Sequence, residues 1–199
     1  NHTSVEHPWF EFSAAGGPAF AEWYLGSDTD PLFLGPWTQT VWHPCGDRFY
    51  YGLFWDGMPD LNLENPKVTE QMYDIAQFWL DEVGVDGYRI DGARHFIEDG
   101  EVQSDTPETR AWLQDFQAVR PEEALILGEV WSPTQIVARY IPGSLDLAFE
   151  DEWARAIIGA AGSGTARSRA DTIDRVIEHY PAGQYATVLT NHDHDRAMS

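Results

Sequence analysis

Residues 87–91, Gly-Tyr-Arg-Ile-Asp, decide the fold, because they form a short, mostly apolar run that ends in a carboxylate. The same arrangement returns at residues 125–129, Leu-Ile-Leu-Gly-Glu, and at residues 188–193, Val-Leu-Thr-Asn-His-Asp. Helical stretches separate the three runs, and this alternation is typical of a parallel sheet. In a barrel of parallel strands, side chains at the C-terminal strand ends converge on one mouth. The pattern therefore predicts an α/β fold that directs three acids, Asp91, Glu129 and Asp193, toward one site.

Such carboxylates suit the cleavage of a glycosidic bond, in which one acid attacks the sugar and a second protonates the leaving oxygen. Arg89 lies on the same side of the strand as Asp91, so its guanidinium can keep Asp91 ionised. Glu129 follows an apolar run, where burial favours the protonated acid. An Arg-x-Asp pair or a Glu at a strand end can equally be a structural ion pair. The residues alone leave both interpretations open.

Four segments together resemble, in order and spacing, the conserved regions of the α-amylase family, glycoside hydrolase family 13. They are Asn-His-Thr-Ser at 1–4, Gly-Tyr-Arg-Ile-Asp-Gly-Ala-Arg-His at 87–95, Gly-Glu-Val-Trp at 128–131 and Thr-Asn-His-Asp at 190–193. A fifth segment, Met-Pro-Asp-Leu-Asn at 58–62, resembles the signature of the family's intermediary group, between oligo-1,6-glucosidase-like and neopullulanase-like members. The resemblance extends over essentially the whole chain.

The resemblance implies a partial (β/α)8 TIM barrel, from about the third to the seventh strand, with an inserted domain B. Residues 1–2 would end the third barrel strand, residues 3–62 would form domain B, and residues 63–199 would form an incomplete catalytic barrel segment. A complete barrel takes about 250 residues, whereas the chain has 199. We therefore expect an internal fragment of a larger enzyme, inactive by itself because open strand edges and missing loops leave the site incomplete.

The resemblance also implies roles for individual residues. Asp91 would be the nucleophile, Glu129 the general acid/base, and Asp193 the acid that binds sugar hydroxyls and stabilises the transition state. The implied substrate-binding residues are His2, Arg89, His192, Arg94 and His95. In true α-amylases the residue at Asn1 and the backbone carbonyl at His95 are calcium ligands, and Ca²⁺ needs six to eight oxygens. No organic cofactor is expected.

Periodicity and capping residues predict the elements that surround these motifs. Asn65 as N-cap and Pro66 at the first helical position begin a helix that ends at Gly84. Residues 162–165, Gly-Ser-Gly-Thr, predict a loop between two helices. The strands expected are 87–91, 124–130, 145–150 and 185–191, and the further helices lie near 107–119, 133–140, 151–160 and 169–179.

Aromatic residues are dense in residues 3–62, which show no sustained helical period. Rings of this kind pack against the apolar C–H faces of sugars, although aromatic side chains more often belong to the core. We expect one or two of them to line the cleft. The candidates are Trp9, Trp23, Trp37, Trp42, Trp55, Phe49, Tyr50 and Tyr51.

The charge of the chain is strongly acidic, with 33 Asp and Glu against 12 Lys and Arg and a net charge of −21. Such a charge disfavours binding to nucleic acids and to anionic membranes, and no apolar run is long enough to cross a bilayer. The chain is either an ordinary acidic enzyme or one adapted to high salt, where screening relieves self-repulsion. The single Cys45 cannot form a disulfide within the chain.

The function expected from the resemblance is that of a retaining α-amylase that cleaves α-1,4 bonds in starch or maltooligosaccharides. An α-glucosidase, a cyclomaltodextrinase or a trehalose synthase would use the same intermediate. A non-catalytic amylase-like scaffold is the alternative of another class, and the three intact acids argue against it. The resemblance favours an extracellular location and leaves the oligomeric state open.

Overall fold

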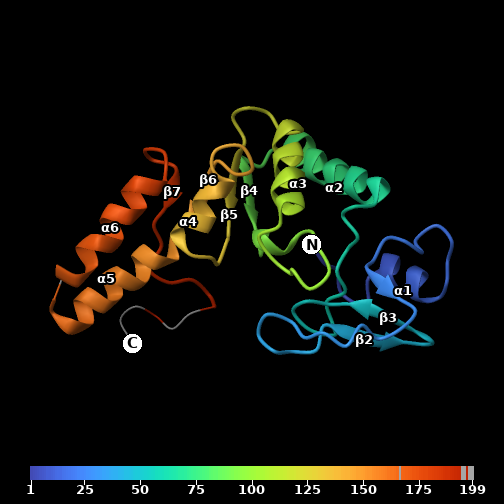
Figure 1. The fold of residues 1–199 in the computed structure, drawn as a ribbon. Helices are drawn as coiled ribbons and strands as arrows, with labels where there is room; N and C mark the ends of the chain where they lie inside the picture. Colours follow the sequence, from blue (N-terminus) through green and yellow to red (C-terminus); the bar gives the residue numbers. More distant parts are fainter. Residues whose placement is uncertain (166, 194–195, 197–199) are drawn as a thin grey trace. The chain divides into compact units, whose positions relative to one another are not determined.

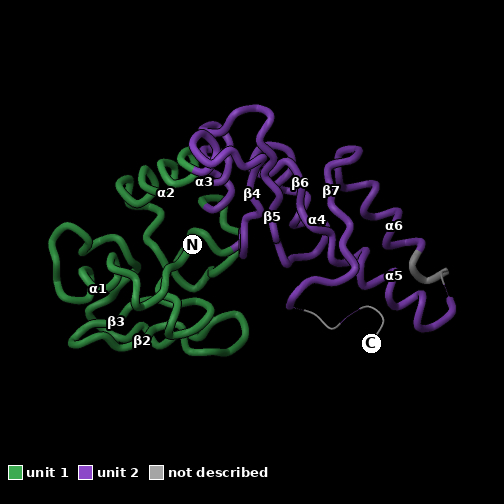
Figure 2. The backbone as a smooth tube through the Cα atoms, turned by 180° about the vertical axis from the view of Figure 1, so that it is seen from behind, with its two compact units in different colours: residues 1–78, 95–108 green, residues 79–94, 109–199 purple. Residues whose placement is uncertain are grey.

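The computed structural model describes residues 1–165, 167–193 and 196. The chain divides into two compact units, residues 1–78 with 95–108 and residues 79–94 with 109–199 (Figure 2). The first unit therefore contains more than residues 3–62, because the next helix and residues 95–108 join it; the predicted boundary of domain B stays a prediction. In the described residues, no helix has both the length and the apolar character needed to cross a membrane.

The second unit contains a parallel sheet of four strands in the order β4-β5-β6-β7 (Figure 1). The strands are β4 (Gly87–Ile90), β5 (Leu125–Gly128), β6 (Leu147–Phe149) and β7 (Tyr185–Ala186). The predicted strands are confirmed in type and order, but all are shorter than expected. The difference is largest in β7, which pairs with β6 through two residues. The described residues form no closed barrel.

The helices of the second unit alternate with these strands. They are α3 (Pro107–Ala118), α4 (Thr134–Val137) with a 3₁₀ turn at Ala138–Tyr140, α5 (Asp151–Ser163) and α6 (Arg167–His179). The Glu150 carboxylate caps α5 by accepting hydrogen bonds from the backbone N–H groups of Glu152 and Trp153. The helix ends at Gly164, whose φ of 68° is left-handed. The loop predicted at 162–165 is therefore shorter than expected, since Gly162 and Ser163 complete the last turn of α5.

The core of the second unit surrounds β5. Ile126 on this strand is fully buried, as are Leu113 of α3 and Leu145 just before β6. Leu145 packs so closely on Gly128 that a Cβ at Gly128 would lie 2.3 Å from the Leu145 Cδ1 atom. The glycine before Glu129 thus lets the core close directly beneath the acid.

The first unit contains a three-stranded antiparallel sheet in the order β1-β3-β2 and two helices. The strands are β1 (Gly26–Ser27), β2 (Trp42–Cys45) and β3 (Arg48–Tyr51), and Val41, Tyr51 and Leu53 form the buried core. The helix α1 (Pro8–Ala14) was not predicted, since seven residues are too few to show a helical period.

The helix α2 (Pro66–Phe78) begins as predicted, because the Asn65 side chain accepts a hydrogen bond from the Lys67 N–H at 3.0 Å. A wider π-helical turn, Trp79–Val83, follows α2. Gly84, with a φ of 78°, comes directly after it, where the sequence predicted the end of the helix.

The first unit contains one buried carboxyl group, that of Asp60, and a partly buried one, that of Glu98. Asp60 of the Met-Pro-Asp-Leu-Asn segment accepts a hydrogen bond from the Leu53 N–H at 2.7 Å, and it is 1% exposed. Burial raises the pKa of Asp60 to about 7. Burial, followed by the nearby charge of Asp60, raises the pKa of Glu98 to about 8. Both groups therefore hold their protons well above the usual range of a carboxyl group.

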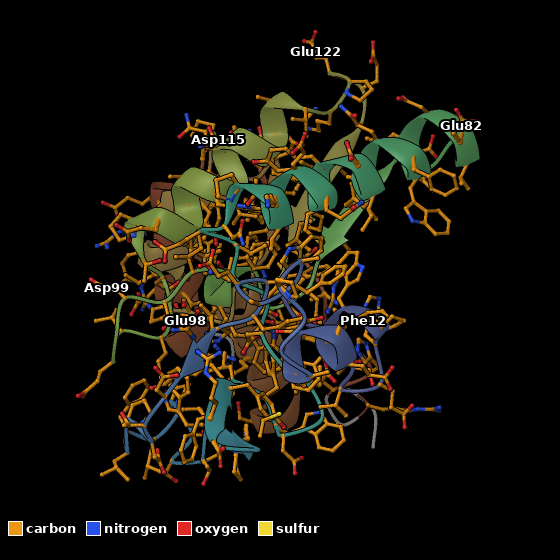
Figure 3. All side chains as sticks on the ribbon, turned by 90° about the vertical axis from the view of Figure 1, so that its right-hand side faces the viewer. Phe12, Glu82, Glu98, Asp99, Asp115 and Glu122 are labelled. Atoms are coloured by element: carbon orange, nitrogen blue, oxygen red, sulfur yellow. The ribbon has the colours of Figure 1, made fainter. Side chains whose placement is uncertain are left out.

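The remaining acidic surplus lies largely at the surface. Figure 3 shows the side chains of Glu82, Asp115 and Glu122 projecting outward from the helical part of the chain, and all three residues are exposed. Carboxylates placed in this way interact with solvent and salt rather than with cationic partners.

Candidate active site

Asp91 and Glu129 follow neighbouring parallel strands at the same level. In the register of β4 and β5, Ile90 lies opposite Gly128, so the two acids occupy the next position on each strand. The backbone continues this pairing, since the Glu129 N–H donates to the Ile90 carbonyl at 2.9 Å and the Ala93 N–H donates to the Glu129 carbonyl at 3.0 Å. The sheet register therefore brings the two predicted catalytic acids to one edge.

Arg89 joins the two acids. Its Nη1 atom donates to Asp91 Oδ1 at 2.5 Å, and its Nη2 atom donates to Glu129 Oε2. The sequence predicted the pair with Asp91 but not the pair with Glu129, which lies 40 residues further along the chain. One planar guanidinium thus fixes both carboxylates, as the fork geometry of arginine allows.

The two carboxylates lie in different surroundings. The Glu129 side chain is 6% exposed, whereas that of Asp91 is 59% exposed. Asp91 is thus open to an approaching molecule. Glu129 is enclosed by protein, with Val130 fully buried beside it. Two acids with unequal environments are what a pair with separate nucleophilic and proton-transferring roles requires.

Asn191 contacts Glu129 and was given no role by the sequence analysis. Its Nδ2 atom donates to Glu129 Oε1 at 3.1 Å, and its Oδ1 atom accepts from the Asp193 N–H at 3.0 Å. The only sequence signal was its place inside the Thr-Asn-His-Asp segment, directly before His192. Asn191 therefore links the third predicted acid to the second.

Asp193 and His192 lie on an exposed turn after this asparagine. His192 Nε2 lies 3.4 Å from Asp193 Oδ2, and the two side chains are 75% and 50% exposed. Within the described residues, Asp193 is connected to Glu129 through Asn191 rather than by a direct contact. The roles predicted for Asp193 and His192 stay predictions.

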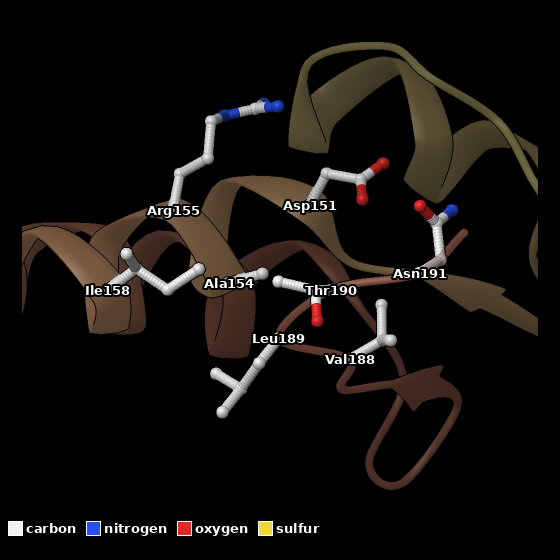
Figure 4. Close-up of a pocket in the computed structure, with 8 residues that line it drawn as sticks. All are labelled: Asp151, Ala154, Arg155, Ile158, Val188, Leu189, Thr190 and Asn191. Atoms are coloured by element: carbon white, nitrogen blue, oxygen red, sulfur yellow. The ribbon is translucent and has the colours of Figure 1, made fainter. Parts of the chain in front are cut away.

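A cavity of about 240 Å³ lies beside this cluster, between the start of α5 and residues 188–191 (Figure 4). Asn191 and Asp151 are both lining residues of this cavity. The cavity is bounded elsewhere by Ala154, Arg155, Ile158, Val188, Leu189 and Thr190. Asn191 connects this cavity to Glu129, whereas Asp91, Glu129 and Asp193 are not among the lining residues.

Arg94, predicted to bind substrate, lies in the second unit after β4. Its Nη1 atom donates to the backbone carbonyl of Trp131, two residues after Glu129. The contact joins the segment after Asp91 to the segment after Glu129. Arg94 thus lies close to the two acids. Its role in substrate binding stays a prediction.

The other predicted residues, Asn1, His2 and His95, belong to the first unit. The Asn1 Nδ2 atom donates to the His95 carbonyl at 2.5 Å, and its Oδ1 atom lies 2.8 Å from His2 Nδ1. The described residues contain no group of three or more His, Cys, Asp or Glu side chains that could hold a metal ion. The two implied calcium ligands, Asn1 and the His95 carbonyl, are hydrogen-bonded to each other. Calcium binding stays a prediction.

Comparison with known proteins gives one consistent result. The family model described as "Alpha amylase, catalytic domain" matches residues 1–199. The crystal structure of an α-amylase from H. orenii superposes with a TM-score of 0.84 at 33% identity, covering 100% of this chain and 42% of that protein. This likeness confirms the predicted partial α/β barrel.

Two relatives with known sequences carry different activities in their names. "Alpha-amylase 3" of Dictyoglomus thermophilum is 37% identical over 147 residues, which are 72% of this chain and 27% of that protein. A "4-alpha-glucanotransferase" of Thermotoga neapolitana is 34% identical over 141 residues, 69% of this chain and 30% of that protein. The chain spans less than a third of the length of these two relatives.

Proposed function

Because this chain belongs to the α-amylase family, we propose that the protein carrying it is a retaining glycoside hydrolase that cleaves α-1,4-glucosidic bonds in starch and maltooligosaccharides. The observation that carries the proposal is the contact of one guanidinium, that of Arg89, with two carboxylates on adjacent strand ends. An exposed Asp91 and a buried Glu129 supply the two unequal acids of the retaining mechanism.

In the proposed first step, a carboxylate oxygen of Asp91 attacks the anomeric carbon and the bond to the leaving oxygen breaks. Glu129 takes up a proton before this step and gives it to that oxygen, so the leaving sugar departs as a neutral alcohol. Arg89 holds the Asp91 carboxylate in position for the attack through its hydrogen bond to Oδ1. The product of this step is a glycosyl ester of Asp91.

In the proposed second step, Glu129 takes a proton from water, and the water oxygen attacks the anomeric carbon. The ester bond breaks and Asp91 returns as a carboxylate. Two inversions restore the α configuration of the product. The mechanism predicts a separation of about 5–5.5 Å between the two carboxyl groups when substrate is bound.

Product analysis on the full-length protein tests this proposal. NMR of the first products from an α-linked glucan should show the α-anomer, and the β-anomer would exclude retention. Asp91→Asn should prevent the covalent intermediate, whereas Glu129→Gln should still form it from a substrate whose leaving group needs no proton. Activity on starch compared with maltose then separates an α-amylase from an α-glucosidase.

Transfer to a sugar acceptor is the second candidate function, because a relative 34% identical to this chain is named as a glucanotransferase. The same glycosyl ester would be attacked by a sugar hydroxyl instead of water, as in a trehalose synthase. Incubation with maltooligosaccharides distinguishes the two outcomes: transfer gives longer chains at a constant number of reducing ends, while hydrolysis increases that number. A protein inactive in both assays would instead be a non-catalytic scaffold.

A further inference from the structure

Both carboxyl oxygens of Glu129 face hydrogen-bond donors. The Arg89 Nη2 atom donates to Oε2, and the Asn191 Nδ2 atom donates to Oε1 at 3.1 Å. This arrangement suits the carboxylate, which accepts hydrogen bonds and has none to donate. The proposed first step, however, starts from the protonated acid. A protonated carboxyl group carries one O–H donor, and on a side chain that is 6% exposed this donor needs an acceptor within the protein.

Asn191 can supply that acceptor, whereas Arg89 cannot. A guanidinium has N–H donors and no acceptor, but a side-chain amide carries a carbonyl oxygen beside its NH2 group. The last torsion of an asparagine side chain is broad and roughly two-fold, so a half-turn exchanges the two ends of the amide in place. This half-turn brings Oδ1 to the position from which Nδ2 now donates. Asn191 can therefore donate to the carboxylate and accept from the acid.

The present orientation of the Asn191 amide is fixed by its other contact. Its Oδ1 atom accepts a hydrogen bond from the Asp193 N–H at 3.0 Å, as in the turns that asparagine side chains form with the backbone two residues on. A backbone N–H only donates, so the end of the amide that faces it must be the oxygen. A half-turn would set the NH2 group against this N–H and open the contact. The amide therefore links the proton of Glu129 to the turn that carries Asp193.

We propose that Asn191 is a positioning residue whose amide follows the proton on Glu129. It donates through Nδ2 to the carboxylate, and it turns to accept through Oδ1 when Oε1 carries a proton. The proton comes from solvent water and leaves to the glycosidic oxygen, so the amide itself gains and loses no atom. The proposal rests on the proposed function, since it requires Glu129 to act both as acid and as base. Each form of Glu129 then keeps a hydrogen-bond partner in a largely enclosed site.

Other charged or titratable groups lie around Glu129 and Asn191. They come from β4 and the residues after it, from the start of α5 and from the turn after Asn191. All of them stay in place when Glu129 is replaced by glutamine, so that variant separates an effect of the Glu129 proton from an effect of theirs. The groups are Arg89, Asp91, Arg94, Asp151, His192 and Asp193.

Asn65 provides a matched control at a similar turn. Its Oδ1 atom accepts from the Lys67 N–H at 3.0 Å, two residues on, and its Nδ2 atom donates at 3.0 Å to a backbone carbonyl, that of Glu22. A backbone carbonyl does not titrate. The two asparagines therefore share their local geometry and differ in whether the group that accepts from Nδ2 can take up a proton.

The first experiment observes the amide by NMR and needs no activity. In the full-length protein with 15N in its asparagine side chains, the signals of Asn191 and Asn65 are assigned by their loss in Asn191→Asp and Asn65→Asp. The Asn191 signal should move with pH, and the nuclear Overhauser effect between its NH2 protons and the Asp193 amide proton should strengthen as the pH falls. Both changes should disappear in Glu129→Gln, and the Asn65 signal should move far less in either protein.

The second experiment measures the two catalytic roles of Glu129 with Asn191→Asp and Asn191→Leu. Aspartate keeps an acceptor for the acid but has no donor for the carboxylate, and leucine has neither. The kcat on starch should fall by about tenfold in both variants, because one hydrogen bond to Glu129 is lost. Formation of the glycosyl ester from a substrate whose leaving group needs no proton should change less than about threefold. Asn65→Leu should leave both rates close to those of the wild type.

An Asn191 signal that ignores pH, or that moves equally in Glu129→Gln, would overturn the proposal, and so would an Overhauser effect that stays constant. Equal losses on starch and on the activated substrate would overturn it too, because they would show that Asn191 only supports the fold. If the wild type hydrolyses no α-glucan, the proposed function fails separately, and the NMR experiment still decides whether the amide follows the Glu129 proton.

Discussion

Replacing Arg89 by alanine should destabilise the folded protein by about 3 kcal/mol, because the substitution leaves Glu129 as a buried carboxylate without its cation. Removing one partner of a fully buried ion pair costs about 3–5 kcal/mol. The lower end applies here, since the Arg89 side chain is 33% exposed and Asn191 still donates to the other oxygen of Glu129. The pair with Asp91, whose side chain is 59% exposed, adds at most about 1 kcal/mol.

Arg48 supplies the control for this substitution. Its Nε atom lies 2.8 Å from Asp28 Oδ1, but the two side chains are 59% and 86% exposed. Arg48→Ala removes the same side chain from a solvated pair and should cost less than about 0.5 kcal/mol. The comparison therefore separates the cost of breaking a buried ion pair from the cost of removing an arginine side chain.

Urea unfolding of the full-length protein, followed by both tryptophan fluorescence and circular dichroism, measures these costs when the two transitions coincide. Adding Glu129→Gln to Arg89→Ala should recover at least about 1 kcal/mol, because the neutral amide no longer needs a cation. Equal costs for Arg89→Ala and Arg48→Ala, or additive effects of the Arg89 and Glu129 substitutions, would refute the reasoning.

Two further predictions concern pH and salt. Burial raises the pKa of Asp60 to about 7 and that of Glu98 to about 8, so the native state holds protons that the unfolded chain has already released. Their contribution to stability is therefore fully present below about pH 4 and is lost as the pH rises toward 8, by at most about 1.4 kcal/mol per pH unit for each group. Asp60→Asn keeps the acceptor for Leu53 and should flatten this dependence in thermal melts between pH 5 and 8; an unchanged slope would contradict the pKa direction. The net charge of −21 predicts a melting temperature that rises from dilute buffer to molar salt, and a constant value would exclude the salt-adapted alternative.

The sequence predicted the order of strands and helices because each element carries its own local signal. Apolar runs marked β4 and β5, and Asn65 and Pro66 marked the start of α2. The end of β7 could not be predicted in this way, since its length depends on how many residues of β6 pair with it. The short helix α1 had too few residues for a period to appear.

Some contacts of the candidate site depend on the pairing of two strands, which a local sequence pattern does not reveal. The Arg89–Asp91 pair follows from two residues on one strand, but the Arg89–Glu129 pair depends on the register that sets Ile90 opposite Gly128. A shift of one residue in the pairing of β4 with β5 would turn Glu129 to the other face of the sheet.

Gly128 helps to set the position of Glu129, because any side chain there would collide with Leu145 of the core. The core contact beneath β5 and the ion pair that joins the two acids therefore meet at one strand, β5, which pairs with β6 on one side and with β4 on the other. A substitution such as Gly128→Ala should displace Glu129 from Arg89 even though it leaves both charged residues in place.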